Sequence, residues 1–143
     1  MKRVDCPADR ISSSPEETLA LGEEFGKELP PGSVVALKGT LGAGKTVFTR
    51  GIALALGIEE EITSPSYTII GEYEGRIPLY HMDAYRLAGD DDFRLAGAEE
   101  YLYGEGICVI EWPERLTLLP GHTIRMAITI ENGGKRRFHR EDP

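Results

Sequence analysis

Hydrophobic and polar positions near the N-terminus follow a helical period. The stretch SPEE at residues 14–17 combines an N-cap serine, a proline at the first helical position and a glutamate three residues after the cap. These features together predict a helix start. Leu21, Phe25 and Leu29 are spaced four apart and form the expected buried stripe, which the Pro-Pro-Gly sequence at residues 30–32 ends.

Two short, continuous apolar runs predict strands that are buried on both faces. They are VVAL at residues 34–37 and ICVI at residues 107–110, and such runs are typical of parallel sheets. Between residues 45 and 56 apolar side chains recur every four positions, which predicts a helix with Gly57 as its C-terminal cap. The order around residue 40 is therefore strand, glycine-rich loop, helix.

The middle of the chain carries weaker signals. Aromatic and β-branched residues at 67–70, continued by Tyr73, predict one strand. Residues 79–82 predict another strand, which ends on Asp83. Residues 93–101 follow an acidic run, and we expect them to form one helix.

The C-terminal part reads as a hairpin. Apolar and polar residues alternate over 124–130, which predicts a half-buried strand, and Asn132 with Gly133 is a hairpin signal. The basic segment 135–140 is the candidate return strand. Because helices interleave with apolar strands, we predict a three-layer α/β sandwich with a largely parallel central sheet, antiparallel edge strands and this C-terminal hairpin.

Length and composition narrow the class of protein. The chain has 143 residues, which predicts a single domain over 1–143. Its net charge of −8 disfavours a dedicated nucleic-acid coat or a membrane-surface protein. We find neither a secretory signal nor an apolar run of membrane-spanning length, and Cys6 and Cys108 have no CxxC spacing. We therefore expect a cytoplasmic protein with structural cysteines and no membrane contact.

The glycine-rich loop carries the strongest chemical signal. GTLGAGKT at residues 39–46 fits G-x-x-x-x-G-K-[ST], the phosphate-binding loop, between a predicted strand and a predicted helix. Backbone amides, the helix N-terminus and Lys45 favour phosphate, and the Thr46 hydroxyl can reach Mg²⁺. The sandwich is thus P-loop NTPase-like, with ATP and Mg²⁺ as expected ligands. The candidate ATP-binding residues are Gly39, Leu41, Gly42, Ala43, Gly44, Lys45, Thr46 and Val47.

Two acids follow predicted strands and are the candidate catalytic residues. Asp83 and Glu111 should project from the sheet edge that also carries the phosphate-binding loop. Hydrolysis needs one carboxylate at the metal and a second group that orients water. From position alone, either acid could take either role; Thr46 and Glu111 are the candidate metal ligands.

Several further residues have two readings. Arg50 and Arg86 either approach the phosphates or form surface ion pairs, and Trp112 either lies beside the nucleotide or packs after a buried strand. Since no arginine finger is evident, we expect slow turnover in isolation that a partner stimulates. His81 is read as a packed or exposed imidazole rather than a catalytic base.

Several further motifs accompany the phosphate-binding loop. In chain order they are GTLGAGKT at 39–46, TRG at 49–51, SPSY at 64–67, HMDAYR at 81–86, LAGAEEY at 95–101 and EW at 111–112. In this order and spacing they resemble the TsaE (YjeE) family of bacterial P-loop ATPases. The resemblance covers roughly residues 15–112 and extends beyond the phosphate-binding loop.

The resemblance implies a specific biological role. It implies an ATPase that assists the TsaB and TsaD proteins in placing the threonylcarbamoyl group on adenosine 37 of tRNAs reading ANN codons, with tRNA contacted through that complex. It also implies that Lys45 and Thr46 bind phosphates and Mg²⁺ and that Asp83 and Glu111 are essential for turnover. The stretch formed by Ser64, Pro65, Ser66 and Tyr67 would be a switch-like, nucleotide-responsive loop.

This sequence departs from the family pattern at a few positions, and other functions stay open. Thr40 replaces the usual acidic residue, and Ser66 replaces the usual threonine while keeping a hydroxyl. The alternatives are a nucleotide-gated binding module and a small-molecule P-loop kinase. A GTPase is disfavoured because no N-K-x-D motif occurs. The basic tail at 135–140 either contacts tRNA or is a charged edge strand.

Overall fold

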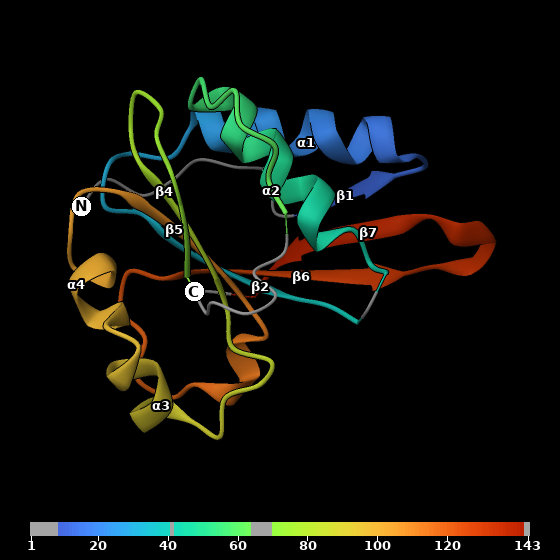
Figure 1. The fold of residues 1–143 in the computed structure, drawn as a ribbon. Helices are drawn as coiled ribbons and strands as arrows, with labels where there is room; N and C mark the ends of the chain where they lie inside the picture. The colour runs from blue at the N-terminus through green and yellow to red at the C-terminus, as the bar shows by residue number, and fades with distance from the viewer. Residues whose placement is uncertain (1–8, 41, 64–69, 142–143) are drawn as a thin grey trace.

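The computed structural model describes residues 9–40, 42–63 and 70–141. Its centre is a seven-stranded sheet in the order β1-β7-β6-β2-β5-β4-β3 (Figure 1). The four central strands are parallel to one another, whereas the remaining strands pair antiparallel at the edges. The strands are β1 (Asp9–Ser12), β2 (Val34–Lys38), β3 (Ile70–Tyr73), β4 (Leu79–Asp83), β5 (Ile107–Glu111), β6 (Ile124–Ile130) and β7 (Arg136–Arg140).

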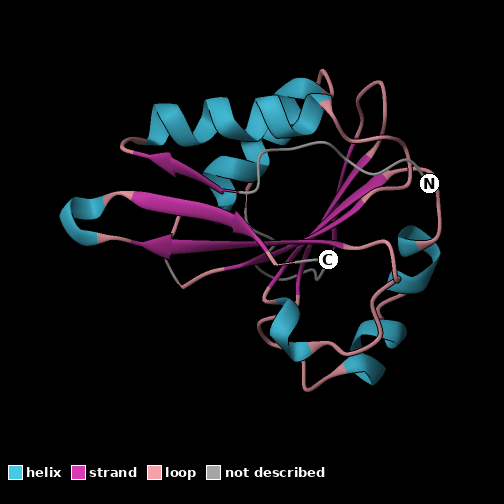
Figure 2. Cartoon of the chain, turned by 180° about the vertical axis from the view of Figure 1, so that it is seen from behind, coloured by secondary structure: helices cyan, strands magenta, loops and turns pink. Residues whose placement is uncertain are grey.

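Helices cover both faces of this sheet, so the α/β sandwich prediction is confirmed. Figures 1 and 2 show α1 (Pro15–Lys27) and α2 (Lys45–Ala55) on one side, with α3 (Asp90–Leu95) and α4 (Ala98–Leu102) on the other. Two apolar clusters fill the spaces between the layers. The cluster beneath α1 and α2 extends to β6 and β7, whereas the other is confined to the half of the sheet that contains β2, β4 and β5.

Glycines let α1 and α2 pack backbone to backbone. A Cβ atom on Gly22 would lie 2.2 Å from the carbonyl oxygen of Phe48, and one on Gly51 would lie 2.3 Å from that of Leu19. Both distances are far inside van der Waals contact, so larger side chains would force the helices apart. This packing fixes α2, and with it the loop that precedes α2, against the rest of the molecule.

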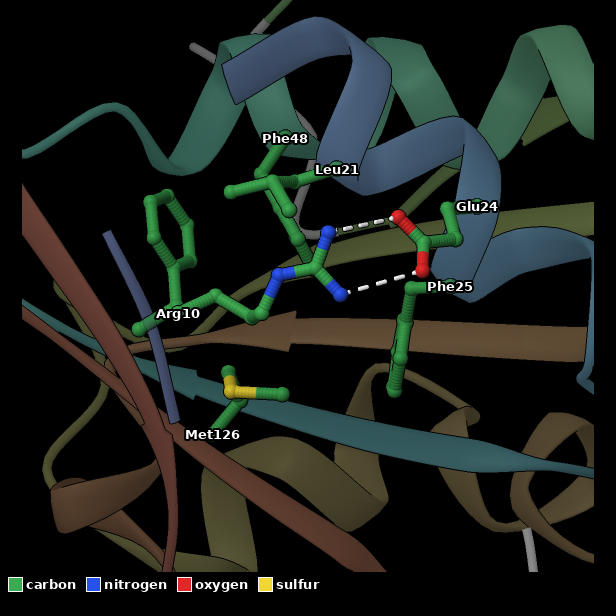
Figure 3. Close-up of a pocket in the computed structure, with 7 residues that line it drawn as sticks. Arg10, Leu21, Glu24, Phe25, Phe48 and Met126 are labelled. Carbon is green, nitrogen blue, oxygen red and sulfur yellow. Dashed lines mark hydrogen bonds and ion pairs between the residues drawn. The ribbon is translucent and has the colours of Figure 1, made fainter. Parts of the chain in front are cut away.

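The edge strand β1 was not predicted from the sequence. It pairs with β7, and Arg10 on β1 donates to both carboxylate oxygens of Glu24 on α1 at 3.1 and 2.9 Å (Figure 3). Phe25, Phe48 and Phe138 lie beside this ion pair, with ring centroids 5.5 and 5.1 Å apart along the series. The bidentate pair therefore fastens the sheet edge to α1 over an aromatic cluster.

Most predicted elements are confirmed, and one is wrong. The serine cap of α1 accepts a hydrogen bond from the Glu17 amide at 3.1 Å, and the C-terminal hairpin forms as expected. Residues 93–101 do not form one helix, because Gly97 adopts a left-handed conformation (φ 83°) that separates α3 from α4. Of the strand predicted at 67–70, residues 67–69 lie outside the described ranges.

Two remaining expectations concern cysteine chemistry and membranes. Cys108 is fully buried in β5, and burial raises the pKa of its thiol to about 12, which fits a structural residue. Cys6 lies outside the described residues. Within the described ranges, none of the helices combines the length and apolar character needed to cross a membrane.

Candidate functional site

The loop between β2 and α2 forms an open cradle at the carboxyl edge of the sheet. Gly42 and Gly44 have φ values of 79° and 105°, a left-handed backbone that favours glycine. Gly44 caps α2 without any side-chain hydrogen bond to the first turn. The first amides of α2 lie at the positive end of the helix dipole, an arrangement that favours an anionic ligand. Leu41 lies outside the described residues.

The alternation of β4 and β5 brings both candidate acids to this cradle. Ile107 and Val109 contribute to the cluster beneath α1 and α2, so Glu111, two residues further on, belongs to the same face. Leu79 likewise places Asp83 on that face. Asp83 and Glu111 are register partners at the ends of adjacent parallel strands, so the sequence expectation that they share one edge is met.

A pocket of about 490 Å³ contains most of the predicted site residues. Nine of the predicted residues line it, together with Tyr85, which the sequence reasoning did not select. The lining consists of Gly42, Ala43, Gly44, Lys45, Thr46, Val47, Asp83, Tyr85, Glu111 and Trp112. Gly39 does not line this pocket; its carbonyl instead holds the Lys45 side chain.

Lys45 is enclosed by groups that favour a cation. Its Nζ donates to the Gly39 carbonyl oxygen at 2.7 Å, lies 4.0 Å from Glu111 Oε1 and sits 4.0 Å from the centre of the Trp112 ring. Burial lowers the pKa of the Lys45 ammonium, and the negative charges of Glu111, Glu114 and Asp83 oppose that shift. One positive charge is thus held where phosphates would approach the helix N-terminus.

The two acids have different surroundings. Glu111 is only 5% exposed, and its Oε2 accepts a hydrogen bond at 2.5 Å from Nε2 of His81, which is fully buried. Asp83 is half-buried, and its Oδ1 accepts a hydrogen bond at 2.9 Å from the Tyr85 amide. His81 is indeed packed, as expected, but its contact with Glu111 was missed. The alternation in β4 was the available signal, because it puts His81 and Asp83 on one face.

Trp112 lines two pockets. It is the one described non-glycine residue with positive φ (59°), directly after β5. Its ring lies 4.8 Å from that of Tyr85 on the pocket side. Trp112 also lines a groove of about 520 Å³ together with Lys38 and His139. The ring lines the pocket and covers Lys45, and it also packs against the apolar cluster that contains Cys108 and Ile110, so packing after a buried strand is observed together with a position at the pocket.

The two candidate arginines do not line the pocket. The Arg50 side chain donates from Nε to the carbonyl oxygen of Ile62 at 3.0 Å and lies 3.8 Å from Glu61, so it braces the segment after α2. Arg86 is exposed and is absent from the pocket lining. Ser64, Pro65, Ser66 and Tyr67, the predicted switch-like loop, lie outside the described residues.

A second pocket of about 200 Å³ adjoins the first and shares Gly42, Ala43, Gly44 and Val47 with it. Its other side is built by the residues that open α1, including Ser13, Ser14 and Thr18, and by Arg136 of β7. Arg136 donates to the Gly42 carbonyl oxygen at 3.0 Å. From the sequence, these residues were interpreted only as a helix start and a basic tail. No motif connects them to the phosphate-binding loop, which is distant in the sequence.

The basic tail is largely paired within the molecule. Arg137 forms ion pairs with Asp9 at 3.0 Å and with Glu131 at 2.6 Å, and hydrogen bonds to both carboxylates raise the pKa of its guanidinium. Arg136 is bonded to the phosphate-binding loop. The tail is not an edge strand, as one interpretation of the sequence expected, because β1 pairs with β7 on its outer side. These contacts explain its basic residues by interactions within the molecule.

Comparison with known proteins agrees with this architecture. The family profile described as "Threonylcarbamoyl adenosine biosynthesis protein TsaE" matches residues 12–139. The tRNA threonylcarbamoyladenosine biosynthesis protein TsaE of Treponema pallidum is 50% identical over 129 residues, which are 90% of this chain and 96% of that protein. The Bacillus subtilis protein of the same name is 44% identical over 85% of this chain and 75% of its own length.

A solved structure also matches. The crystal structure of Bacillus subtilis YdiB superposes with a TM-score of 0.74 and 37% identity, covering 92% of this chain and 82% of that chain. The profile and the relatives span both the phosphate-binding loop and the two strand-end acids. The chain therefore belongs to the TsaE family of threonylcarbamoyladenosine biosynthesis proteins.

Proposed function

We propose that this chain is a single-domain, Mg²⁺-dependent ATPase that supports TsaB and TsaD in the threonylcarbamoylation of adenosine 37 in tRNAs reading ANN codons. One observation carries the proposal. The side chains of Lys45 and Glu111 are both buried, and Lys45 Nζ lies 4.0 Å from Glu111 Oε1. The pair lies beside a glycine-rich helix N-terminus that has no side-chain cap. Enclosing both charges costs desolvation free energy, and charged groups enclosed in a cleft are enriched at ligand-binding and catalytic sites.

The chain's own groups fit a triphosphate. Amides of the glycine-rich loop and of the first turn of α2 would donate to phosphate oxygens, and Lys45 would add a full positive charge. To do so, the Lys45 ammonium exchanges its bond to the Gly39 carbonyl for a phosphate oxygen. Trp112 and Tyr85, whose ring centroids lie 4.8 Å apart, place aromatic surface on the same pocket.

The donor set also fits Mg²⁺ shared with phosphate. No described cluster of three or more histidine, cysteine or acidic side chains could hold a metal alone. Thr46 and Glu111 line the same pocket, and a magnesium site of this type relies on few protein ligands plus phosphate oxygens. When bound, Mg²⁺ would neutralise developing phosphate charge; Thr46 and Glu111 would hold it, and the half-buried Asp83 would orient the attacking water.

The adjoining pocket is suited to the nucleoside part of ATP. It continues from the phosphate-binding loop and is lined by Ser13, Ser14 and Thr18 and by Arg136. Hydroxyls and a guanidinium can hydrogen-bond to a ribose or a base. Binding there would connect α1 and β7 to the occupied phosphate site.

We infer that the isolated protein turns over slowly and that its partners accelerate it. Among the described residues that line the main pocket, Lys45 is the only basic side chain. Arg50 is engaged with Ile62 and Glu61, and Arg86 lies outside the lining. An arginine supplied to such a site raises kcat about 10³- to 10⁵-fold. A partner that supplies one on docking would therefore increase kcat strongly.

The test measures ATP turnover by the protein alone and with purified TsaB, TsaD and tRNA, and threonylcarbamoylated tRNA is quantified in parallel. We expect slow Mg²⁺-dependent turnover alone, a clear increase with the partners, and loss of both activities in Glu111→Gln. The matched control is Glu60→Gln, which makes the same chemical change at an exposed position.

Two results would count against the proposal. Turnover that the partners leave unchanged contradicts partner stimulation. If a non-hydrolysable ATP analogue supports repeated modification cycles, the protein is a nucleotide-gated binding module rather than an ATPase. Calorimetry with ATP decides whether the nucleotide binds at all.

A further inference from the structure

His81 occupies an unusual position for a histidine. It lies in the middle of β4, where it is fully buried, and its neighbours in register are Gly71 on β3 and Val109 on β5. On the face beneath α2 it is the diagonal neighbour of Glu111, which is two residues beyond Val109. A buried imidazole in a central strand needs a polar partner, and Glu111 supplies it at 2.5 Å.

The chemistry of the contact fixes where the imidazole proton lies. An ionised carboxylate only accepts hydrogen bonds, so Nε2 of His81 carries the hydrogen and donates to Glu111 Oε2. Nδ1 of His81 is buried and has no partner within residues 9–40, 42–63 and 70–141. The geometry therefore places a hydrogen on Nε2 of His81, in the bond to Glu111.

This hydrogen bond also gives the two Glu111 carboxylate oxygens different neighbours. Oε2 is engaged by His81, whereas Oε1 lies 4.0 Å from Lys45 Nζ. A carboxylate without the first contact could rotate about its last side-chain torsion, which is a broad and weakly restricted one. With it, one oxygen is held toward β4 and the other toward the phosphate-binding loop.

We propose that His81 is a positioning residue that, as a hydrogen-bond donor through Nε2, fixes the Glu111 carboxylate so that Oε1 faces the phosphate-binding loop. The inference rests on the proposed ATPase function and assigns to it a residue outside the pocket lining. Partners of this kind, one shell removed from a reacting group, change activity about 10- to 100-fold when they are removed.

The experiment compares two substitutions at one position. His81→Phe keeps a ring of similar size but has no donor, and we expect its kcat for ATP to fall about 10- to 100-fold, with KM changed much less. His81→Gln can place an amide donor near the position of Nε2, and we expect it to recover most of the lost kcat. The control is His122→Phe, which makes the same change at an exposed histidine.

A double variant separates positioning from a general effect on folding. If His81 acts through Glu111, adding His81→Phe to Glu111→Gln lowers kcat no further than Glu111→Gln alone. Additive losses, an unchanged kcat in His81→Phe, or a His81→Gln protein as impaired as His81→Phe would each overturn the proposal. Thermal unfolding of every variant identifies any that does not fold.

A measurement without turnover keeps the proposal testable if His81→Phe fails to fold or if the protein is not an ATPase. Nitrogen-15 NMR of the wild-type protein, with signals assigned through His122→Gln and His139→Gln, reports the tautomer of His81. We expect an Nε2–H proton that is strongly shifted downfield and that disappears in Glu111→Ala. An Nδ1–H tautomer overturns the inference, whereas absent ATP turnover with the expected tautomer overturns only the proposed function.

Discussion

The carboxyl ends of β4 and β5 lie side by side and carry equivalent acids, yet they differ in environment. Glu111 is 5% exposed and is held between His81 and Lys45. Asp83, its register partner, is half-buried and accepts a hydrogen bond from the amide of Tyr85, two residues further along the chain. Two strand-end acids at the same level of one sheet are therefore not interchangeable.

The difference follows from position within the sheet. β5 is flanked by β2 and β4, so its last residue is enclosed on both sides, and its contacts come from distant parts of the chain. β4 lies one strand nearer to the edge, and Asp83 leads directly into a turn. A carboxylate with two fixed neighbours is suited to hold a charge in one place, whereas one with access to solvent is suited to exchange water.

The first prediction tests the comparison by substituting each of the two acids, Glu111 and Asp83. Because Glu111 is fixed beside Lys45, we expect Glu111→Gln to lower kcat for ATP at least about 100-fold, in the range seen when a preorganised electrostatic group is removed. Asp83→Asn, which alters a more solvated group, should cost about tenfold. Steady-state kinetics at saturating Mg²⁺, with ATP affinity measured by calorimetry, checks both values.

Both amides are nearly the same size as the acids they replace, so the unfolding midpoints serve as the control. Glu111→Gln should retain ATP affinity better than it retains turnover. Equal losses of kcat in the two variants, or a larger loss in Asp83→Asn, would show that burial does not separate their roles.

The sequence was sufficient for the parts of the fold that depend on local patterns. The apolar runs at β2 and β5 and the cap of α1 predicted those elements, because continuous burial and helix capping depend on residues that are adjacent in the sequence. β1 was missed because four residues without alternation form a strand only by pairing with β7, more than a hundred positions away. The break at Gly97 was missed because the flanking pattern is helical on both sides.

The site shows the same division. The phosphate-binding loop and both acids could be predicted, because a motif and two strand ends identify them. The contact of His81 with Glu111 and that of Arg136 with Gly42 could not, since each joins segments that are far apart in the sequence. Tyr85 was missed because its place in the pocket depends on the direction of the turn after β4.

The second prediction removes the positive charge of Lys45, which lies beside Glu111. Lys45→Met keeps most of the aliphatic side chain but deletes charge-assisted contacts worth about 1.5 to 3 kcal/mol each, so ATP affinity should fall about tenfold or more. Isothermal calorimetry with ATP and Mg²⁺ measures the change. Lys27→Met, at an exposed position near the end of α1, is the matched control. Unchanged affinity in Lys45→Met would mean that ATP binds elsewhere.

The third and smallest effect concerns an acid outside the pocket, which shows what a carboxylate does when its role is structural. Asp90 begins α3 and accepts hydrogen bonds from the Thr117 hydroxyl at 2.5 Å, the Thr117 amide at 2.8 Å and the Leu118 amide at 3.1 Å. These bonds, that of the hydroxyl first, lower the pKa of Asp90 below its ordinary value of 3.8.

The sign of the pH dependence follows from that shift. A carboxyl group with a lowered pKa stabilises the folded state above its unfolded pKa, and the contribution is lost as the pH falls through the folded value. We expect Asp90→Asn to unfold a few degrees lower than wild type at neutral pH, with the two midpoints converging below about pH 3.8. Asp91→Asn, at an exposed neighbouring position, should show no such convergence. Parallel midpoints for Asp90→Asn and wild type across this range would mean that the charge on Asp90 does not hold the Thr117 segment, and that an acid of this chain can be well bonded without contributing to stability.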